Sequence, residues 1–315
     1  MLDERALNEF ESVFEAAVRP RVRLAPVRWA RILVALDGSP ASASGIALGE
    51  LLAQRKDAAL HFLATRSLAP GEDAARAAET LEAEQTTAVA QAKQKELKVS
   101  GSAALAPPGD AILAELRAAP TSLLVIPTPF GGQTPDATSL GSTVDHLLRA
   151  SDCPALLLKH PVLRPEDVFR RVLAYVPSGF EVGPHFSIPF DLVEPNGTLE
   201  LIHVVNEREI ARYAAAFEVT ADGDDERAKT QSMVEGIERR MTALLDAALR
   251  EVRNEPFTCR SVVVHGDPLE RVASHVLDFE ASLLVVESES RPETPVTPEA
   301  YHLLKEITGI PLLAL

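Results

Sequence analysis

The chain has 315 residues, more than one core of ordinary size needs, and this length predicts two domains. The apolar content of 46% is typical of a soluble globular protein, and 31 basic against 46 acidic residues give a formal net charge of −15. A surface of that sign repels phosphate backbones, so we expect no sequence-independent binding of nucleic acid. No apolar stretch is long enough to cross a bilayer, and the acidic N-terminus lacks the basic start of a signal peptide. We therefore expect a cytoplasmic protein without a membrane partner.

The first elements alternate regularly along the chain. Apolar residues at helical spacing over 2–18 predict an N-terminal helix, and Pro20 ends that pattern. The stretch RILVALDGSPASASGIALGELLA (31–53) predicts a strand, an acidic turn and a helix. Further strands are expected at 58–68, 98–106, 122–128 and 153–159, with helices at 71–97, 107–120 and 139–151. Strands that alternate with helices are typical of an α/β fold with a parallel sheet covered on both faces.

The landmarks of this first part recur later in the chain. RILVA at Arg31 matches RVLAY at Arg171, and SLLVIPT (122–128) matches SLLVVES (282–288). Two copies of one α/β unit account for this order best. We predict an N-terminal helix and connector at 1–29, a first domain at 30–160, and a second, degenerate domain at 161–315.

The second copy departs from the first at the acidic turn. Pro177-Ser178-Gly179 stands where the first copy has Asp37-Gly38-Ser39. The helix that should follow is expected to be short or displaced, because it contains Pro184, Pro189 and Pro195. An acidic stretch at 217–229 predicts a solvated loop before a helix over 230–252.

A glycine-rich loop follows the fourth strand, with the sequence PTPFGGQTPDATSLGSTVDHLL (127–148). Gly131 and Gly132 permit a close backbone approach, and Gly141-Ser142-Thr143 opens a helix with two hydroxyl groups at its positive end. A phosphate fits between such a turn and such a helix start. A purely structural turn with a capped helix explains the same residues, so both interpretations stay open.

The remaining candidates have ordinary structural interpretations. Asp136 and Asp145 flank the glycine loop and could help to bind Mg²⁺, but a solvated loop acid and a helix-surface acid explain them as well. His203 ends a strand-like run, and we interpret it as structural. Cys153 and Cys259 predict small buried thiols and no disulfide framework. We assign no catalytic residue and no protein metal site.

The whole pattern resembles the universal stress protein family. The resemblance rests on the order strand–DGS–helix, then GD before a helix, then a glycine loop leading to Gly-Ser and a Cys-Pro strand. It covers roughly residues 30–160 and, more faintly, 170–315. It implies two tandem five-stranded units of the adenine-nucleotide-binding fold, whose final strands pair as an internal pseudo-dimer. Two such chains could also form a homodimer, although the sequence shows no second interface.

The resemblance also implies a nucleotide site in the first domain. Members of the family that bind ATP share a loop pattern Gly-x2-Gly-x9-Gly-Ser/Thr and an Asp that ends the first strand. The matching positions here are Ala35, Leu36, Asp37, Ala64, Gly131, Gly141, Ser142 and Thr143, and Thr128 stands in place of the first loop glycine. Pro127 and Pro129 flank Thr128, restrict the loop and remove N–H donors.

Two functions remain open at this stage. The first is a stress-response protein that binds ATP, with or without Mg²⁺, in its first domain, where Asp37 contacts the nucleoside or its metal. The second domain is then nucleotide-free, because Pro177 replaces the acid and Glu287, Glu289 and Glu293 repel a triphosphate. The alternative is a nucleotide-free scaffold that acts through protein–protein contacts. No general base and no Lys/Arg clamp is evident near the loop, so any ATP hydrolysis is expected to be slow.

Overall fold

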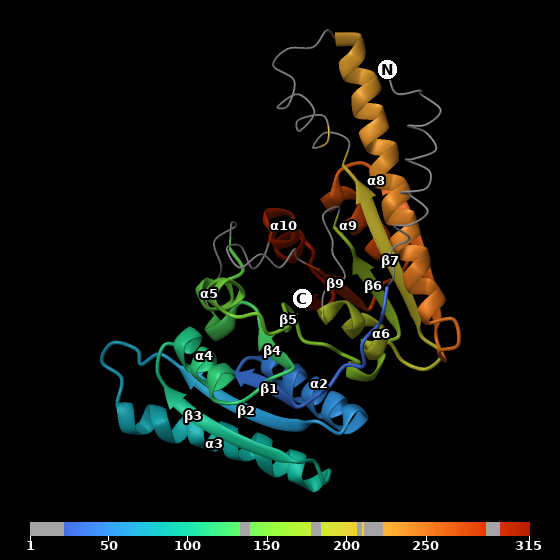
Figure 1. Ribbon diagram of the computed structural model, residues 1–315. Helices are drawn as coiled ribbons and strands as arrows, with labels where there is room; N and C mark the ends of the chain where they lie inside the picture. Colours follow the sequence, from blue (N-terminus) through green and yellow to red (C-terminus); the bar gives the residue numbers. More distant parts are fainter. Residues whose placement is uncertain (1–21, 133–138, 178–183, 207–209, 211–222, 288–296) are drawn as a thin grey trace.

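A computed structural model describes residues 22–132, 139–177, 184–206, 210, 223–287 and 297–315 (Figure 1). The expected helix over 2–18 lies outside this described part. The first unit comprises β1 (Arg31–Leu36), α2 (Pro40–Lys56), β2 (Ala59–Arg66), α3 (Ala74–Gln94), β3 (Val99–Leu105), α4 (Pro108–Ala118), β4 (Leu123–Pro127), η1 (Phe130–Gly132), α5 (Ser142–Ala150) and β5 (Ala155–Leu158).

A short connector with η2 (Pro165–Asp167) leads to the second unit. This unit comprises β6 (Arg171–Tyr175), η3 (Pro184–Ser187), α6 (Ile188–Leu192), β7 (Thr198–Val205), α8 (Gly223–Glu251), β8 (Thr258–His265), α9 (Pro268–Asp278), β9 (Leu283–Val286), α10 (Pro298–Glu306) and β10 (Leu312–Ala314). The predicted domain boundary at 160/161 lies in this connector, between β5 and β6.

The ten strands form one sheet in the order β3-β2-β1-β4-β5-β10-β9-β6-β7-β8. Neighbouring strands are parallel within each unit. The two units meet where β5 pairs antiparallel with β10, with Leu157 opposite Leu312 and Leu156 opposite Leu313. The predicted fold class, a tandem of two five-stranded α/β units, is thus confirmed.

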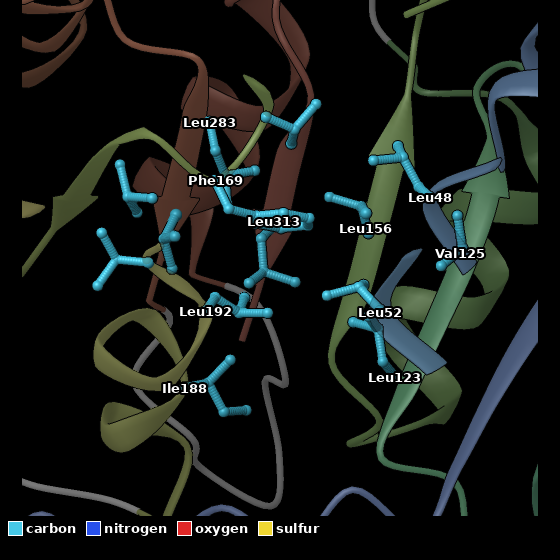
Figure 2. Close-up of a cluster of buried hydrophobic side chains, with 14 of the residues drawn as sticks. Leu48, Leu52, Leu123, Val125, Leu156, Phe169, Ile188, Leu192, Leu283 and Leu313 are labelled. Atoms are coloured by element: carbon cyan, nitrogen blue, oxygen red, sulfur yellow. The ribbon is translucent and has the colours of Figure 1, made fainter. Parts of the chain in front are cut away.

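Apolar side chains cover both faces of the sheet and continue across the junction of the units. One buried cluster lies under α2, α3, α6 and α8, and a second lies under α4, α5, α9 and α10. Figure 2 shows part of the first cluster, where Leu156 of β5 lies beside Leu313 of β10 and side chains of both units pack around them. The two units therefore share one hydrophobic core on each face.

The second unit differs from the first in its helices. Among the described residues between β6 and β7, the one α-helix is the five-residue α6, where the first unit has the 17-residue α2, which confirms the short helix. The expected loop over 217–229 is wrong in its second part, because α8 begins at Gly223. The acidic residues after Gly223 stand at the N-terminal end of that helix, where the helix dipole favours negative charge.

Both cysteines are partly buried and free of disulfides. Burial raises the pKa of the Cys153 thiol and of the Cys259 thiol to about 12. Both thiols therefore stay protonated at neutral pH, as expected for structural cysteines.

Candidate functional site

Asp37 lies directly after β1, at the carboxyl edge of the sheet, and joins two loops there. Its Oδ1 accepts hydrogen bonds from Ser42 Oγ at 2.7 Å and from the Ser39 amide at 3.0 Å. Its Oδ2 accepts a hydrogen bond from the Gly131 amide at 2.7 Å. The carboxylate therefore fixes the start of α2 and holds the glycine-rich loop against the end of β1.

The two predicted loop glycines both adopt left-handed backbone angles. The φ angle is +80° at Gly131 and +103° at Gly141. A Cβ added at Gly131 would meet no atom of the described residues within 4 Å, whereas one at Gly141 would lie 3.2 Å from the Cβ of Pro129. The positive φ favours glycine at both positions.

Thr128 continues the sheet and does not take the conformation that a loop glycine offers. Its φ is not positive, and its amide donates a hydrogen bond to the Leu158 carbonyl of β5 at 2.9 Å. The following peptide to Pro129 is cis. Because the Thr128 amide already has a partner in the sheet, it is not available to a ligand.

Helix α5 begins at Ser142, as the Gly-Ser-Thr sequence predicts, and its start carries no side-chain cap. Gly141 is the N-cap, and the first helical hydrogen bond runs from the Asp145 amide to the Gly141 carbonyl at 2.9 Å. The amides of the first turn therefore lack intrahelical partners, and the positive end of the helix dipole lies at the exposed Ser142. Such a helix start favours an anionic ligand.

The start of α5 borders a cavity of about 530 Å³ on the first unit. Its lining residues are Arg66, Ser67, Pro107, Pro108, Gly109, Asp110, Phe130, Gly131, Ser142, Thr143 and His146. Three of the predicted site residues, Gly131, Ser142 and Thr143, are thus brought together around one open volume. The other six lie outside this lining. Four of them are buried, namely Ala35, Leu36, Ala64 and Thr128. The carboxylate of Asp37 accepts the hydrogen bond of the Gly131 amide, and Gly141 lies against Pro129.

A basic side chain that sequence reasoning missed, that of Arg66, lines the cavity. Arg66 is the last residue of β2 and forms a two-pronged ion pair with Glu72, with 2.7 Å between Nη1 and Oε2. Hydrogen bonding to the guanidinium lowers the pKa of Glu72 to about 2. Sequence reasoning found no Lys/Arg clamp near the loop and did not place Arg66 there, because only the order of the parallel strands brings the end of β2 to the same edge as the loop after β4. The lining also brings His146 Nε2 to 3.7 Å from Asp110 Oδ1.

Asp145 does not lie on an exposed helix surface, which corrects the expectation for that residue. Its side chain is 8% exposed. Its Oδ2 accepts a hydrogen bond from Ser139 Oγ at 2.6 Å, and its Oδ1 accepts one from the Tyr301 hydroxyl at 2.7 Å. Asp145 is therefore part of a buried contact between the units, and Asp136 lies outside the described residues.

The first unit is similar to a known family. Residues 28–159 match the Universal stress protein family. The match ends one residue after β5 and so covers the first unit and the glycine-rich loop. None of the curated proteins compared with the chain matches it.

Solved structures extend the fold similarity to both units. A functionally unknown protein from Pseudomonas aeruginosa is 18% identical, with a TM-score of 0.60, and the match covers 92% of each chain. A universal stress protein from Archaeoglobus fulgidus is 13% identical, with a TM-score of 0.58, over 92% of this chain and 97% of that one. At these identities the similarity shows a shared fold over nearly the whole chain.

The second unit differs from the first at the corresponding edge of the sheet. Its corresponding helix α10 is capped, because Thr297 Oγ1 accepts a hydrogen bond from the Ala300 amide at 3.1 Å. Pro298 removes a further N–H from the first turn. The second unit therefore lacks the uncapped helix start that borders the cavity of the first.

One of the acidic residues expected to repel a triphosphate in the second unit is buried. Glu287 is 4% exposed, and burial raises its pKa well above the ordinary value, which favours the neutral carboxyl. Burial thus weakens the charge repulsion expected of Glu287, and Glu289 and Glu293 lie outside the described residues. His203 is fully buried with its Nδ1 2.7 Å from the Val176 carbonyl, an arrangement typical of a structural histidine.

Two further findings concern the described part of the chain. No group of three or more His, Cys, Asp or Glu side chains in it could hold a metal ion. No helix in the same ranges has the length and the apolar character needed to span a membrane.

Proposed function

We propose that the chain is a cytoplasmic stress-response protein whose first unit binds ATP or a related adenine nucleotide, while its second unit binds none. The observation that carries the proposal is the cavity of about 530 Å³, where Gly131, Arg66 and the uncapped start of α5 meet. The match of residues 28–159 to the universal stress protein family supports the choice of ligand class.

The residues around the cavity suit the phosphates of such a ligand. The first-turn amides of α5 would donate to phosphate oxygens, with the hydroxyl groups of Ser142 and Thr143 beside them. Arg66, which also lines the cavity, adds positive charge, and the missing Cβ of Gly131 leaves the backbone open to close approach by the ligand. A bound Mg²⁺ would neutralise part of the phosphate charge.

Asp37 would act at this site mainly through the loop. Both of its oxygens have protein partners, but a carboxylate can accept about four hydrogen bonds and so retains capacity for a ribose hydroxyl or a metal-bound water. We propose binding rather than efficient turnover, because the guanidinium of Arg66 is already paired with Glu72.

A nucleotide-free scaffold is the second candidate, and one observation favours it. Ala35, Leu36 and Ala64, which the resemblance assigns to the adenine pocket, are fully buried and do not line the cavity. An adenine ring would therefore have to bind elsewhere along the edge, or the edge would have to open.

Two substitutions at Ser142, one that adds a negative charge and one that does not, test the proposal. Ser142→Asp places a carboxylate at the start of α5, where the helix dipole and the free amides stabilise it, so the protein should remain as stable as before or become slightly more stable. The same carboxylate should abolish binding of ATP·Mg²⁺ by repelling the phosphates. Ser142→Asn, which has nearly the same shape without the charge, should retain binding.

Titration calorimetry with ATP·Mg²⁺ measures the affinity and stoichiometry, and mass spectrometry of the denatured protein identifies any co-purified nucleotide. We expect one nucleotide per chain. A chain that releases no nucleotide and binds no added ATP would favour the scaffold, and a stoichiometry of two would contradict a nucleotide-free second unit. Equal binding by both Ser142 variants would place the ligand away from α5.

A further inference from the structure

Helix α10 belongs to the second unit by sequence, but side chains of the first unit form hydrogen bonds near both of its ends. Near its start, the Tyr301 hydroxyl donates a hydrogen bond to Asp145 Oδ1 at 2.7 Å. At its end, Lys159 Nζ donates to the carbonyls of Lys305 and Ile307 at 2.6 and 2.7 Å. The helix therefore bridges the two units in addition to the pairing of β5 with β10.

The contact at Tyr301 reaches the loop that leads to the cavity. The Leu140 amide points at the same pair of groups, 3.3 Å from Tyr301 Oη and 3.3 Å from Asp145 Oδ1. Asp145 Oδ2 accepts the hydrogen bond of Ser139 Oγ, which itself accepts one from the Gly141 amide at 2.8 Å. One connected set of hydrogen bonds thus runs from Tyr301 to Gly141, the residue directly before the uncapped turn of α5.

The state of the tyrosine supports this role. Burial, together with the hydrogen bond to the Asp145 carboxylate, raises the pKa of Tyr301, so its hydroxyl stays protonated and continues to donate. Asp145 is almost completely buried, so a lost donor would leave a carboxylate oxygen poorly satisfied. The loop conformation is therefore sensitive to this single hydroxyl group.

The same helix also contacts the edge of its own unit. Two positions before Tyr301, Glu299 accepts a hydrogen bond from the hydroxyl of Tyr175, the last residue of β6. One turn of α10 thus connects the carboxyl edge of the second unit with the glycine-rich loop of the first.

We propose that Tyr301 is a positioning residue for the anion site of the first unit, and that a ligand bound there is coupled through Asp145 to helix α10 of the second unit. The identity of the ligand as a nucleotide rests on the proposed function; the positioning of Gly141 and α5 by Tyr301 does not. Such coupling is reciprocal: if Tyr301 favours the binding conformation, ligand binding must also stabilise α10.

Tyr301→Phe tests the coupling, because it removes the hydroxyl and leaves the ring. Binding of ATP·Mg²⁺ should weaken at least about fivefold, the lower range of measured coupling between sites. In the unmodified chain, ATP·Mg²⁺ should slow hydrogen exchange of the α10 amides, and this protection should disappear in Tyr301→Phe. The matched control is Lys159→Met, which removes the other contact to α10 and should leave the affinity unchanged.

A double variant separates a specific contact from a general loss of packing. Tyr301→Phe combined with Asp145→Ala should bind no more weakly than Asp145→Ala alone, because Asp145→Ala already removes the acceptor of the Tyr301 hydroxyl. Equal affinity of Tyr301→Phe and the unmodified chain, or α10 protection that persists without the hydroxyl, would overturn the proposal.

Hydrogen exchange without ligand keeps the proposal testable if no nucleotide binds. The amides of Leu140, Gly141 and Asp145, which all have hydrogen-bond partners, should then exchange faster in Tyr301→Phe than in the unmodified chain. Failure of the unmodified chain to bind ATP·Mg²⁺ would refute the proposed function alone, whereas unchanged exchange at these amides would refute the positioning role.

Discussion

A single buried carboxyl group, Glu287, makes the stability of the second unit depend on pH. It follows β9 directly, is nearly inaccessible to solvent, and its Oε1 has no hydrogen-bond partner in the described part of the chain. Burial raises its pKa in the folded protein far above 4.5, the ordinary value. The folded chain therefore holds a proton that the unfolded chain releases above about pH 4.5.

We expect the unfolding free energy of the unmodified chain to decrease as pH rises from about 4.5 towards the folded pKa of Glu287. Because the folded state binds one more proton in this range, the loss approaches about 1.4 kcal/mol per pH unit. Glu287→Gln has no proton to release, so its stability should increase relative to the unmodified chain as pH rises. Urea unfolding at pH 5, 6, 7 and 8 measures the two slopes.

The control for this measurement is Glu82→Gln, the same chemical change at an exposed position of α3. Its unfolding free energy should follow that of the unmodified chain at every pH. If Glu287→Gln also runs parallel to the unmodified chain, Glu287 is ionised in the folded protein and the assignment of a neutral carboxyl is wrong.

At the scale of single residues, sequence could place Asp37, Gly131 and Ser142 because they stand beside local signals: a strand end, a glycine turn and a helix start. It could not place Arg66 at the cavity or Tyr301 beside Asp145, since each meets its partner only through the sheet order or the junction of the units. It also could not reveal that Glu287 is buried with a raised pKa, because the pKa of a carboxyl depends on its surroundings in the fold.

At the scale of elements, helix α2 lies so close to β1 that one of its glycines is required. A Cβ at Gly49 would stand 2.5 Å from Val34 Cγ2 and 3.2 Å from Leu60 Cδ1. Gly45, one helical turn earlier, has room for a methyl group, because the nearest atoms would lie at 3.5–3.6 Å. The two positions differ in packing while sharing the same helix.

Gly49→Ala should therefore destabilise the protein by about 1–3 kcal/mol, because buried Val34 is stiff and has nowhere to move. Gly45→Ala should instead stabilise it by about 0.5–1 kcal/mol through the better helix propensity of alanine. Denaturant unfolding compares the two variants directly. Equal effects of the two substitutions would mean that the helix adjusts its distance from the sheet.

Sequence predicted most elements of the first unit because hydrophobic runs and helical spacing alternate there without interruption. The structural boundaries differ from the predicted ones by a few residues, as for the helix expected over 71–97 and found at Ala74–Gln94. The start of α8 was missed since a run of Asp and Glu was interpreted as solvated loop. The same acids are favourable in the first turns of a helix, a signal that the charge pattern alone does not distinguish.

At the scale of the whole molecule, the two units form one sheet and share both apolar clusters. Leu157 of β5 lies at the centre of this arrangement, fully buried and opposite Leu312 of β10. The units are therefore expected to unfold together, because separating them would expose β5, β10 and the leucines around them.

Leu157→Asp should break this cooperativity. A carboxylate at a fully buried leucine position lacks partners among its apolar neighbours, and the loss of the side chain alone costs about 2–5 kcal/mol. Scanning calorimetry should show one transition for the unmodified chain and two separate transitions for the variant, one for each unit. The matched control is Leu163→Asp in the connector, where the leucine is 95% exposed and the same substitution should leave the single transition unchanged. A single transition in Leu157→Asp at the unmodified temperature would show that α10, held by Asp145 and Lys159, suffices to join the units without the β5–β10 pairing.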